Sequence, residues 1–152
     1  MAQIKRIALF LDGTWNTLDD STNVWRLKML CNTSPEQISY YSQGVGTQIG
    51  QKITGGMFGI GINEEVESAY EWLSEHYTEG AQIFIFGFSR GAFTARSLAG
   101  FISECGLVKP GSPLSMKQLY ARYRRGNTVS IRAIPRIQAE FLGSIVGKRF
   151  EQ

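Results

Sequence analysis

Residues 82–91, with the sequence QIFIFGFSRG, decide the fold class that we predict for this chain. The run from Ile83 to Phe86 is apolar and rich in β-branched and aromatic residues, as in a short buried strand. Apolar residues then recur at helical spacing over 90–104, and Gly106 is placed to end that helix. A strand that passes directly into a helix is typical of α/β proteins with parallel sheets.

Similar patterns predict the other elements. Further strands are expected at 4–11, 37–42 and 138–146. A short helix is expected to begin at Thr22 or Asn23 and to place Val24, Leu27 and Leu30 on one face. Two more helices are expected over 64–78, with Asn63 as the N-cap, and over 115–125. Glu64, Glu65 and Glu67 would then lie in a first turn, where the helix dipole favours acidic residues.

The stretch from Gly44 to Gly61 contains seven glycines and is predicted to be a loop. Strands that alternate with helices predict a three-layer α/β fold with a mostly parallel sheet and right-handed crossovers. Ligands of such sheets bind at the carboxyl ends of the strands. We therefore expect the loops 12–16, 44–47 and 87–91 to meet at that edge.

The composition of the 152 residues, 43% hydrophobic and 19% charged, indicates one globular domain over 1–152. The longest apolar run is far shorter than the roughly 20 residues that cross a membrane. The apolar run 7–11 follows Lys5 and Arg6 but is too short for a signal peptide, and Asp12 ends it. The sequence thus predicts a cytoplasmic chain with no transmembrane segment.

Cys31 and Cys105 have no spacing typical of a metal site, so we expect neither metal nor cofactor. The two thiols are expected to be free in a reducing cell, with a disulfide as the alternative. Residues 109–152 hold nine Lys and Arg but two Asp and Glu. The basic segment 117–136 could contact phosphates of lipid or nucleic acid, or form a solvated face.

The pattern Gly87-Phe88-Ser89-Arg90-Gly91 between a strand and a helix predicts a nucleophile elbow. Ser89 would be the catalytic nucleophile, and the backbone N–H of Arg90 would help to hold an oxyanion. The second donor is expected from Gly13 or Thr14. The alternative for Ser89 is an ordinary N-cap serine. A phosphatase of the haloacid dehalogenase class is disfavoured, because its nucleophilic aspartate would stand where this chain has Phe10.

Three stretches together resemble a bacterial α/β-hydrolase family, the type VI secretion phospholipase effectors of the Tle class. They are 7–16, Tyr41 with 44–47, and 86–96, and the likeness runs from residue 4 to about residue 143. The resemblance implies a serine esterase or phospholipase that acts on a lipid or ester substrate, and it leaves secretion by the type VI route open as an alternative to the cytoplasm. It also implies Ser89 as the nucleophile and an active-site loop at Asp12 to Thr14. Asp12, Trp15, Gly46 and Thr47 are the expected substrate-binding residues.

The family uses a Ser-Asp-His triad, but this chain has no aspartate and no histidine after Ser89. Its single histidine, His76, is expected at the opposite edge of the sheet, roughly 17–20 Å from Ser89. Glu104 is likewise expected at the far end of its helix. We therefore expect a truncated domain that lacks the later strands and is weakly active alone.

Such a domain would expose a sheet edge and pair with itself or with a completing second chain. The first hypothesis is a serine hydrolase whose acid and base come from that second chain. The alternative is a non-catalytic binding or assembly subunit that oligomerises through the exposed edge, and a truncated product without a present role also stays open.

Overall fold

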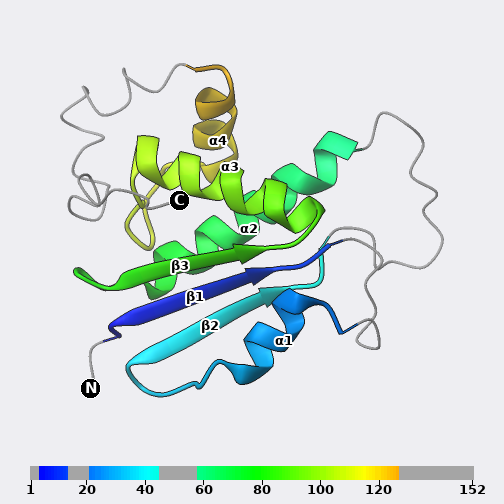
Figure 1. The fold of residues 1–152 in the computed structure, drawn as a ribbon. Coiled ribbons are helices and arrows are strands. Elements are labelled where there is room, and N and C mark those ends of the chain that lie inside the picture. Colours follow the sequence, from blue (N-terminus) through cyan, green and yellow to red (C-terminus); the bar gives the residue numbers. More distant parts are fainter. Residues whose placement is uncertain (1–3, 14–20, 45–57, 127–152) are drawn as a thin grey trace.

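Three parallel strands form the centre of the computed structural model, which describes residues 4–13, 21–44 and 58–126 (Figure 1). They are β1 (Arg6–Leu11), β2 (Gln37–Ser42) and β3 (Gln82–Gly87), in the spatial order β2-β1-β3. Leu9 of β1 lies opposite Tyr40 of β2 and Ile85 of β3. The three predicted strands in this part of the chain are therefore confirmed, and the predicted strand 138–146 lies outside the described residues.

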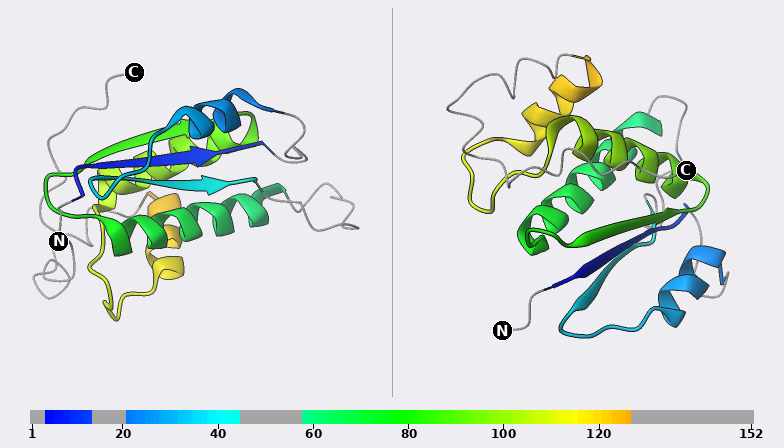
Figure 2. Two further views of the ribbon diagram at one scale, coloured as in Figure 1. Left: turned by 90° about the horizontal axis from the view of Figure 1, so that it is seen from below. Right: turned by 60° about the vertical axis from the view of Figure 1, so that its left-hand side comes forward.

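Helices cover both faces of the sheet in the described part of the chain. They are α1 (Asn23–Leu30), α2 (Phe58–His76), α3 (Arg90–Cys105) and α4 (Met116–Arg124). Figure 2 shows α1 on one face and α2 with α3 on the other, and α4 contacts α2 and α3. The predicted α/β class with a parallel sheet and three layers is thus observed over these residues.

The central strand β1 is buried on both of its faces because helices lie on both sides of it. Ile7, Leu9 and Leu11 point toward α2 and α3 and are 0% exposed. Ala8 and Phe10 point the other way and pack with Val24 of α1. A strand covered on both sides has a continuous apolar sequence, which explains the run from Ile7 to Leu11.

Helix α2 is longer than the sequence predicts. It begins at Phe58, so the last part of the predicted glycine-rich loop is helical, and Asn63 lies inside the helix instead of capping it. None of the three glutamates at 64, 65 and 67 lies in the first turn. Glycine in a helix costs only about 1 kcal/mol relative to alanine, and packing of the helix can offset such a cost. Local propensity therefore misplaced this boundary.

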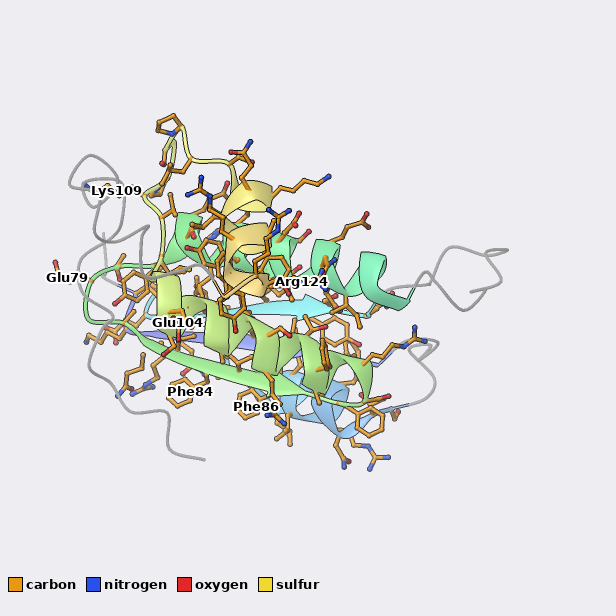
Figure 3. All side chains as sticks on the ribbon, turned by 90° about the horizontal axis from the view of Figure 1, so that it is seen from above. Glu79, Phe84, Phe86, Glu104, Lys109 and Arg124 are labelled. Atoms are coloured by element: carbon orange, nitrogen blue, oxygen red, sulfur yellow. The ribbon has the colours of Figure 1, made fainter. Side chains whose placement is uncertain are left out.

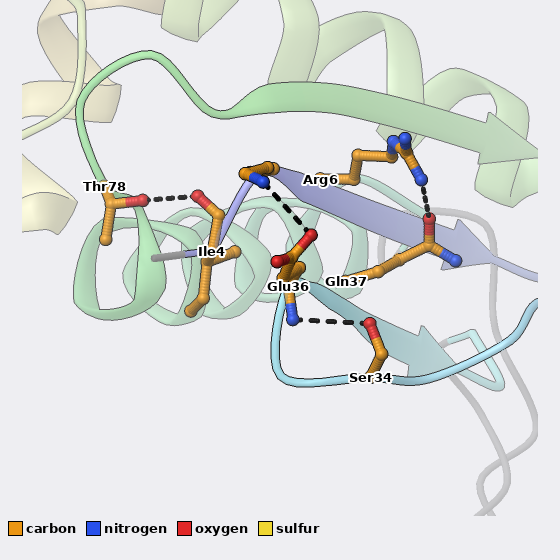
Figure 4. A network of polar contacts seen from close by, with 7 residues as sticks. Ile4, Arg6, Ser34, Glu36, Gln37 and Thr78 are labelled. Carbon is orange, nitrogen blue, oxygen red and sulfur yellow. Dashed lines mark hydrogen bonds and ion pairs between the residues drawn. The ribbon is translucent and has the colours of Figure 1, made fainter. Parts of the chain in front are cut away.

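The amino edge of the sheet is fastened by contacts shown in Figure 4. The Lys5 ammonium lies 3.2 Å from a Glu36 carboxylate oxygen, and the Arg6 guanidinium donates to the Gln37 side chain. Thr78, just after α2, donates its hydroxyl to the Ile4 carbonyl oxygen at 2.7 Å. The carboxyl end of α2 therefore lies at the amino edge of the sheet.

Both cysteines are free thiols, so the disulfide alternative does not apply. Cys105, the last residue of α3, is buried in the core, and Cys31 is half-buried at the end of α1. Among the described helices we find none with the length and apolar character that crossing a membrane requires.

Candidate active site at the carboxyl edge

Ser89 occupies the turn between β3 and α3 with an unusual backbone conformation. Its φ is 55° and its ψ is −121°, a region that residues other than glycine rarely adopt and that costs about 1–3 kcal/mol. The side chain is exposed and makes no capping hydrogen bond to α3. The turn therefore presents the hydroxyl to solvent at the carboxyl edge, and the N-cap alternative has no hydrogen bond to support it.

The two glycines that flank Ser89 allow β3, α3 and β1 to approach closely. A Cβ atom on Gly87 would lie 2.6 Å from the Ala92 Cα. A Cβ atom on Gly91 would overlap the Leu11 carbonyl oxygen. The atoms that these Cβ atoms would overlap belong to the backbone, which cannot move aside as the end of a flexible side chain can. The spacing of glycines around Ser89 is thus explained by packing of the turn against the end of β1.

The ends of all three strands are joined by backbone contacts at this edge, which Figure 1 shows at the arrowheads. The Phe88 N–H donates to the Leu11 carbonyl oxygen at 3.0 Å, and the Asp12 N–H donates to the Ser42 carbonyl oxygen at 2.9 Å. The described parts of the three predicted edge loops therefore lie together.

Asp12 is a buried carboxylate, 1% exposed, on the α1 side of this edge. Its Oδ1 accepts the Gly13 N–H at 2.8 Å, and its Oδ2 accepts the hydroxyls of Thr22 and Tyr41. Burial, the hydrogen bond to Asp12 and the charge of Asp12 together raise the pKa of Tyr41 to about 12. Asp12 thus ties the loop after β1 to the start of α1 and to β2.

Glu65 is a second buried carboxylate, 7% exposed, on the α2 and α3 side. Its Oε1 accepts the Ser42 hydroxyl at 2.7 Å, and its Oε2 accepts the Thr94 hydroxyl at 2.9 Å. Burial raises the pKa of the Glu65 carboxyl above its usual value, although these two hydrogen bonds and the charge of Arg90 act in the opposite direction. Glu65 thus links α2 to the end of β2 and to α3.

Of the remaining predicted site residues, Gly13 and Arg90 lie within the described part of the chain and four others do not. Arg90 is half-buried at the first position of α3, directly after Ser89. Thr14, Trp15, Gly46 and Thr47 lie outside the described residues. The Gly13 N–H, a predicted oxyanion donor, is engaged with the Asp12 carboxylate.

His76 is the last residue of α2 and belongs to the opposite edge of the sheet. Its ring stacks on Trp72 with centroids 4.4 Å apart, and its Nδ1 lies 2.7 Å from the Trp72 carbonyl oxygen. Glu104 lies at the end of α3 remote from Ser89. Neither side chain is placed to act on the Ser89 hydroxyl, as the sequence predicts.

Phe10, where a haloacid dehalogenase would carry its nucleophile, is buried and stacks on Phe86 with ring centroids 5.1 Å apart. No carboxylate chemistry is possible at that position. Within residues 4–13, 21–44 and 58–126, no group of three or more His, Cys, Asp and Glu side chains is arranged to hold a metal ion. The basic residues Lys117, Arg122 and Arg124 of α4, and Arg125 directly after it, are exposed.

Sequence reasoning missed the polar partners of the two buried carboxylates. Glu65 was expected on a helix terminus, and Ser42, Thr94 and Thr22 were given no role at the edge. The sequence does contain one indication of these contacts. Glu65 lies on the same helical stripe as the apolar residues Ile62, Val66 and Ala69. A charged residue on a buried stripe is expected to have hydrogen-bond partners.

Comparison with known proteins agrees with the earlier resemblance. Residues 5–141 match the family described as "T6SS, Phospholipase effector Tle1-like, catalytic domain". A Saccharomyces cerevisiae protein, "Uncharacterized protein YEL023C", is 33% identical over 141 residues. The alignment covers 80% of this chain and 20% of the yeast protein, so the chain spans about a fifth of that relative. No solved structure gives a significant match.

The match to the family covers most of the chain, in agreement with the three sequence stretches that suggested it. The relative is a yeast protein, so the expected bacterial source has no support from it. The chain belongs to the family of Tle1-like phospholipase effector catalytic domains of the type VI secretion system.

Proposed function

We propose that this chain forms the nucleophile-bearing part of an α/β-hydrolase that cleaves ester bonds of lipids, with Ser89 as the nucleophile. The observation that carries the proposal is the Ser89 turn: an exposed hydroxyl on a strained backbone, at the start of α3, between two glycines that permit close packing. Family membership supports a lipid substrate. This geometry is the one that a nucleophile elbow requires.

In the proposed reaction, the Ser89 Oγ attacks the ester carbonyl carbon while a base takes the hydroxyl proton. The carbonyl oxygen becomes an oxyanion, which the Arg90 N–H at the start of α3 would stabilise. Because the Gly13 N–H already donates to Asp12, we assign the second donor to Thr14. Collapse of the oxyanion expels the alcohol, which takes up the proton held by the base. Water, deprotonated by the same base, then releases the acyl group as the acid and returns the proton to the Ser89 Oγ.

The acid and the base of the triad are proposed to come from polypeptide other than residues 1–152. His76 is at the wrong edge, and no other histidine occurs in the chain. A serine hydroxyl without a neighbouring base is a weak nucleophile, so residues 1–152 alone should turn over slowly. Asp12 is proposed to hold the loop instead of contacting substrate, and Trp15, Gly46 and Thr47 stay candidates for substrate contact.

The exposed basic residues of α4 offer a way to approach a substrate membrane. Lys117, Arg122 and Arg124 are exposed on this short helix, Arg125 follows it directly and is also exposed, and Figure 3 labels Arg124. Basic residues near an anionic leaflet contribute about 1 kcal/mol each. We propose that this helix attracts phosphate-bearing headgroups, which fits either the cytoplasm or delivery by type VI secretion.

A specific observation also favours the second candidate, a binding or assembly subunit. β3 is an outer strand of the described sheet, and its Phe84 and Phe86 are 43% and 37% exposed. Figure 3 labels both side chains along β3. With Leu27 and Leu30 of α1 they line an open hollow of about 330 Å³. An apolar edge of this kind is suited to pairing with a second copy.

One experiment separates the two functions. A fluorophosphonate probe is added to purified protein and to the S89A variant, and the mass of each is measured by light scattering. Labelling at residue 89 that is lost in S89A supports the hydrolase. An unlabelled Ser89 in a stable dimer would favour the assembly subunit. Because residues 1–152 place no base beside Ser89, the hydrolase proposal is contradicted when Ser89 also stays unlabelled with candidate partner chains present.

A further inference from the structure

The structure assigns to Glu65 the role of a positioning residue that holds the Ser89 turn against the end of β2. Glu65 lies on α2, its Oε2 accepts from Thr94 on α3, and its Oε1 accepts from Ser42 at the end of β2. One carboxylate therefore joins three elements beside the proposed nucleophile. The catalytic meaning of this role rests on the proposed function, whereas the mechanical role does not.

The link to the nucleophile runs through the first turns of α3. Thr94 is fully buried, and its hydroxyl lies 3.3 Å from the Arg90 carbonyl oxygen as well as near Glu65. The Ala92 N–H donates to the Ser89 carbonyl oxygen at 3.0 Å. A displacement of Thr94 would therefore be transmitted to Arg90, whose N–H is the proposed oxyanion donor, and to Ser89 itself.

The link to the neighbouring loop runs through Ser42. Its hydroxyl donates to Glu65 and accepts the Gly44 N–H at 3.3 Å, while its carbonyl oxygen accepts the Asp12 N–H. The preceding residue, Tyr41, donates to Asp12 on the other face of the sheet. Tyr41 and Ser42, consecutive residues of β2, therefore donate to buried carboxylates on opposite faces of the sheet. Tyr41 donates to Asp12 on the α1 side, and Ser42 donates to Glu65 on the α3 side.

Strain at Ser89 explains why such a fastening is needed. A serine at φ 55° persists only where its surroundings hold it, and a buried carboxylate with two hydroxyl donors supplies such a restraint. Hydrogen bonds to charged groups are stronger than those between neutral groups. The turn should relax when the Glu65–Thr94 bond is removed, even if the fold is retained.

The test compares T94V, which removes the hydroxyl, with T94S, which keeps it, and with E65Q. The Gln side chain keeps one acceptor oxygen and offers an NH2 donor, which the Ser42 or Thr94 hydroxyl can accept. Amide hydrogen exchange is followed by NMR at Phe88 and Ala92, with Gly106 at the far end of α3 as the internal reference. In T94V the two turn amides should exchange about tenfold faster than in the wild type, relative to Gly106. T94S and E65Q should stay within about threefold of the wild type.

Equal acceleration of all three amides in T94V, or none, would overturn the positioning role. If T94V does not fold, the same amides are measured in E65L. A folded E65L variant with unchanged exchange at Phe88 and Ala92 would overturn the positioning role, and a selective increase at these two amides would support it. Fluorophosphonate labelling of the wild type tests the proposed hydrolase separately. Where labelling occurs, T94V should lower the maximal labelling rate about tenfold without changing the half-saturating probe concentration.

Discussion

The two faces of the sheet are covered to very different degrees. On the α2 and α3 face, the inward side chains of β1 are 0% exposed and pack in one large cluster with both helices. On the α1 face, the described residues Ala8, Phe10 and Val24 form a small buried cluster, and Phe84 and Phe86 of β3 are exposed. The short helix α1 covers β1 but does not reach across β3.

The difference shows which face can hold a strained turn. Residue 89 is supported by α3, by the close approach of Gly91 to β1 and by the Glu65 carboxylate, all on the covered face or at its edge. The open face offers apolar surface for a partner instead. Packing density on one side and exposed phenylalanines on the other thus separate a stable site from a surface for association.

The largest expected effect comes from G91A, which tests the close approach on the covered face. The added Cβ would overlap the Leu11 carbonyl oxygen, so we expect a loss of about 5 kcal/mol or failure to fold. G100A on the same helix is the matched control, because its Cβ meets only the hydroxyl end of Tyr123. G100A should change the free energy of unfolding by about 1 kcal/mol or less, because the helix propensity that alanine gains offsets the displacement of the Tyr123 hydroxyl. Urea unfolding followed by circular dichroism measures both, and a stable G91A would break the comparison.

A pair of leucine-to-alanine changes compares the faces directly. Leu98 of α3 is 0% exposed, whereas Leu30 of α1 is 83% exposed. L98A should lower the free energy of unfolding by about 3 kcal/mol, because it leaves a cavity in the large cluster. L30A should change it by less than about 0.5 kcal/mol. Equal losses in the two variants would mean that the open face is covered in solution, which light scattering of L30A would then show as a change in mass.

Much of this fold could be predicted from the sequence because β1 and β3 carry strong local signals. The apolar run Ile7–Leu11 and the strand–turn–helix segment around Ser89 identified the strands, α3 and the carboxyl-edge site. The parallel order of the strands then brought the described loop ends together, as general topology predicts. The turn at residue 89 could be predicted because glycines flank it between a strand and a helix, whereas the role of Ser89 as a nucleophile stays a prediction.

Other features could not be predicted because they depend on distant partners. The predicted start of α2 was wrong, because the glycines near Gly61 indicated a loop. The packing that offsets the low helix propensity of these glycines cannot be inferred from the local sequence. The partner hydroxyls of Glu65 lie 23 and 29 residues away. Leu27 and Leu30 have helical spacing but are exposed, because α1 packs against the sheet through Val24 and leaves the rest of its apolar stripe uncovered. Periodicity identifies an apolar stripe without showing how much of the stripe is covered.

The smallest expected effect concerns two neighbouring tyrosines of β2 that point to opposite faces. Burial raises the pKa of Tyr41 to about 12, and the hydrogen bond to Asp12 adds to this effect. Burial and the charge of Glu65 raise the pKa of Tyr40, whose phenol makes no direct hydrogen bond to that carboxylate. A raised phenol pKa stabilises the folded state fully below the unfolded value of about 10 and ceases to do so as pH rises toward 12. The stability difference between wild type and Y41F should therefore shrink across that interval.

Unfolding midpoints in urea at several pH values between 9 and 12 measure this difference, and Y40F is the matched variant on the other face. We expect a steeper pH dependence for the Tyr41 pair, because its phenol donates directly to a buried carboxylate. A difference for Y41F that does not vary with pH would show that the Asp12 bond is absent in solution. The loop after β1 would then lack the fastening that makes the α1 face part of the site.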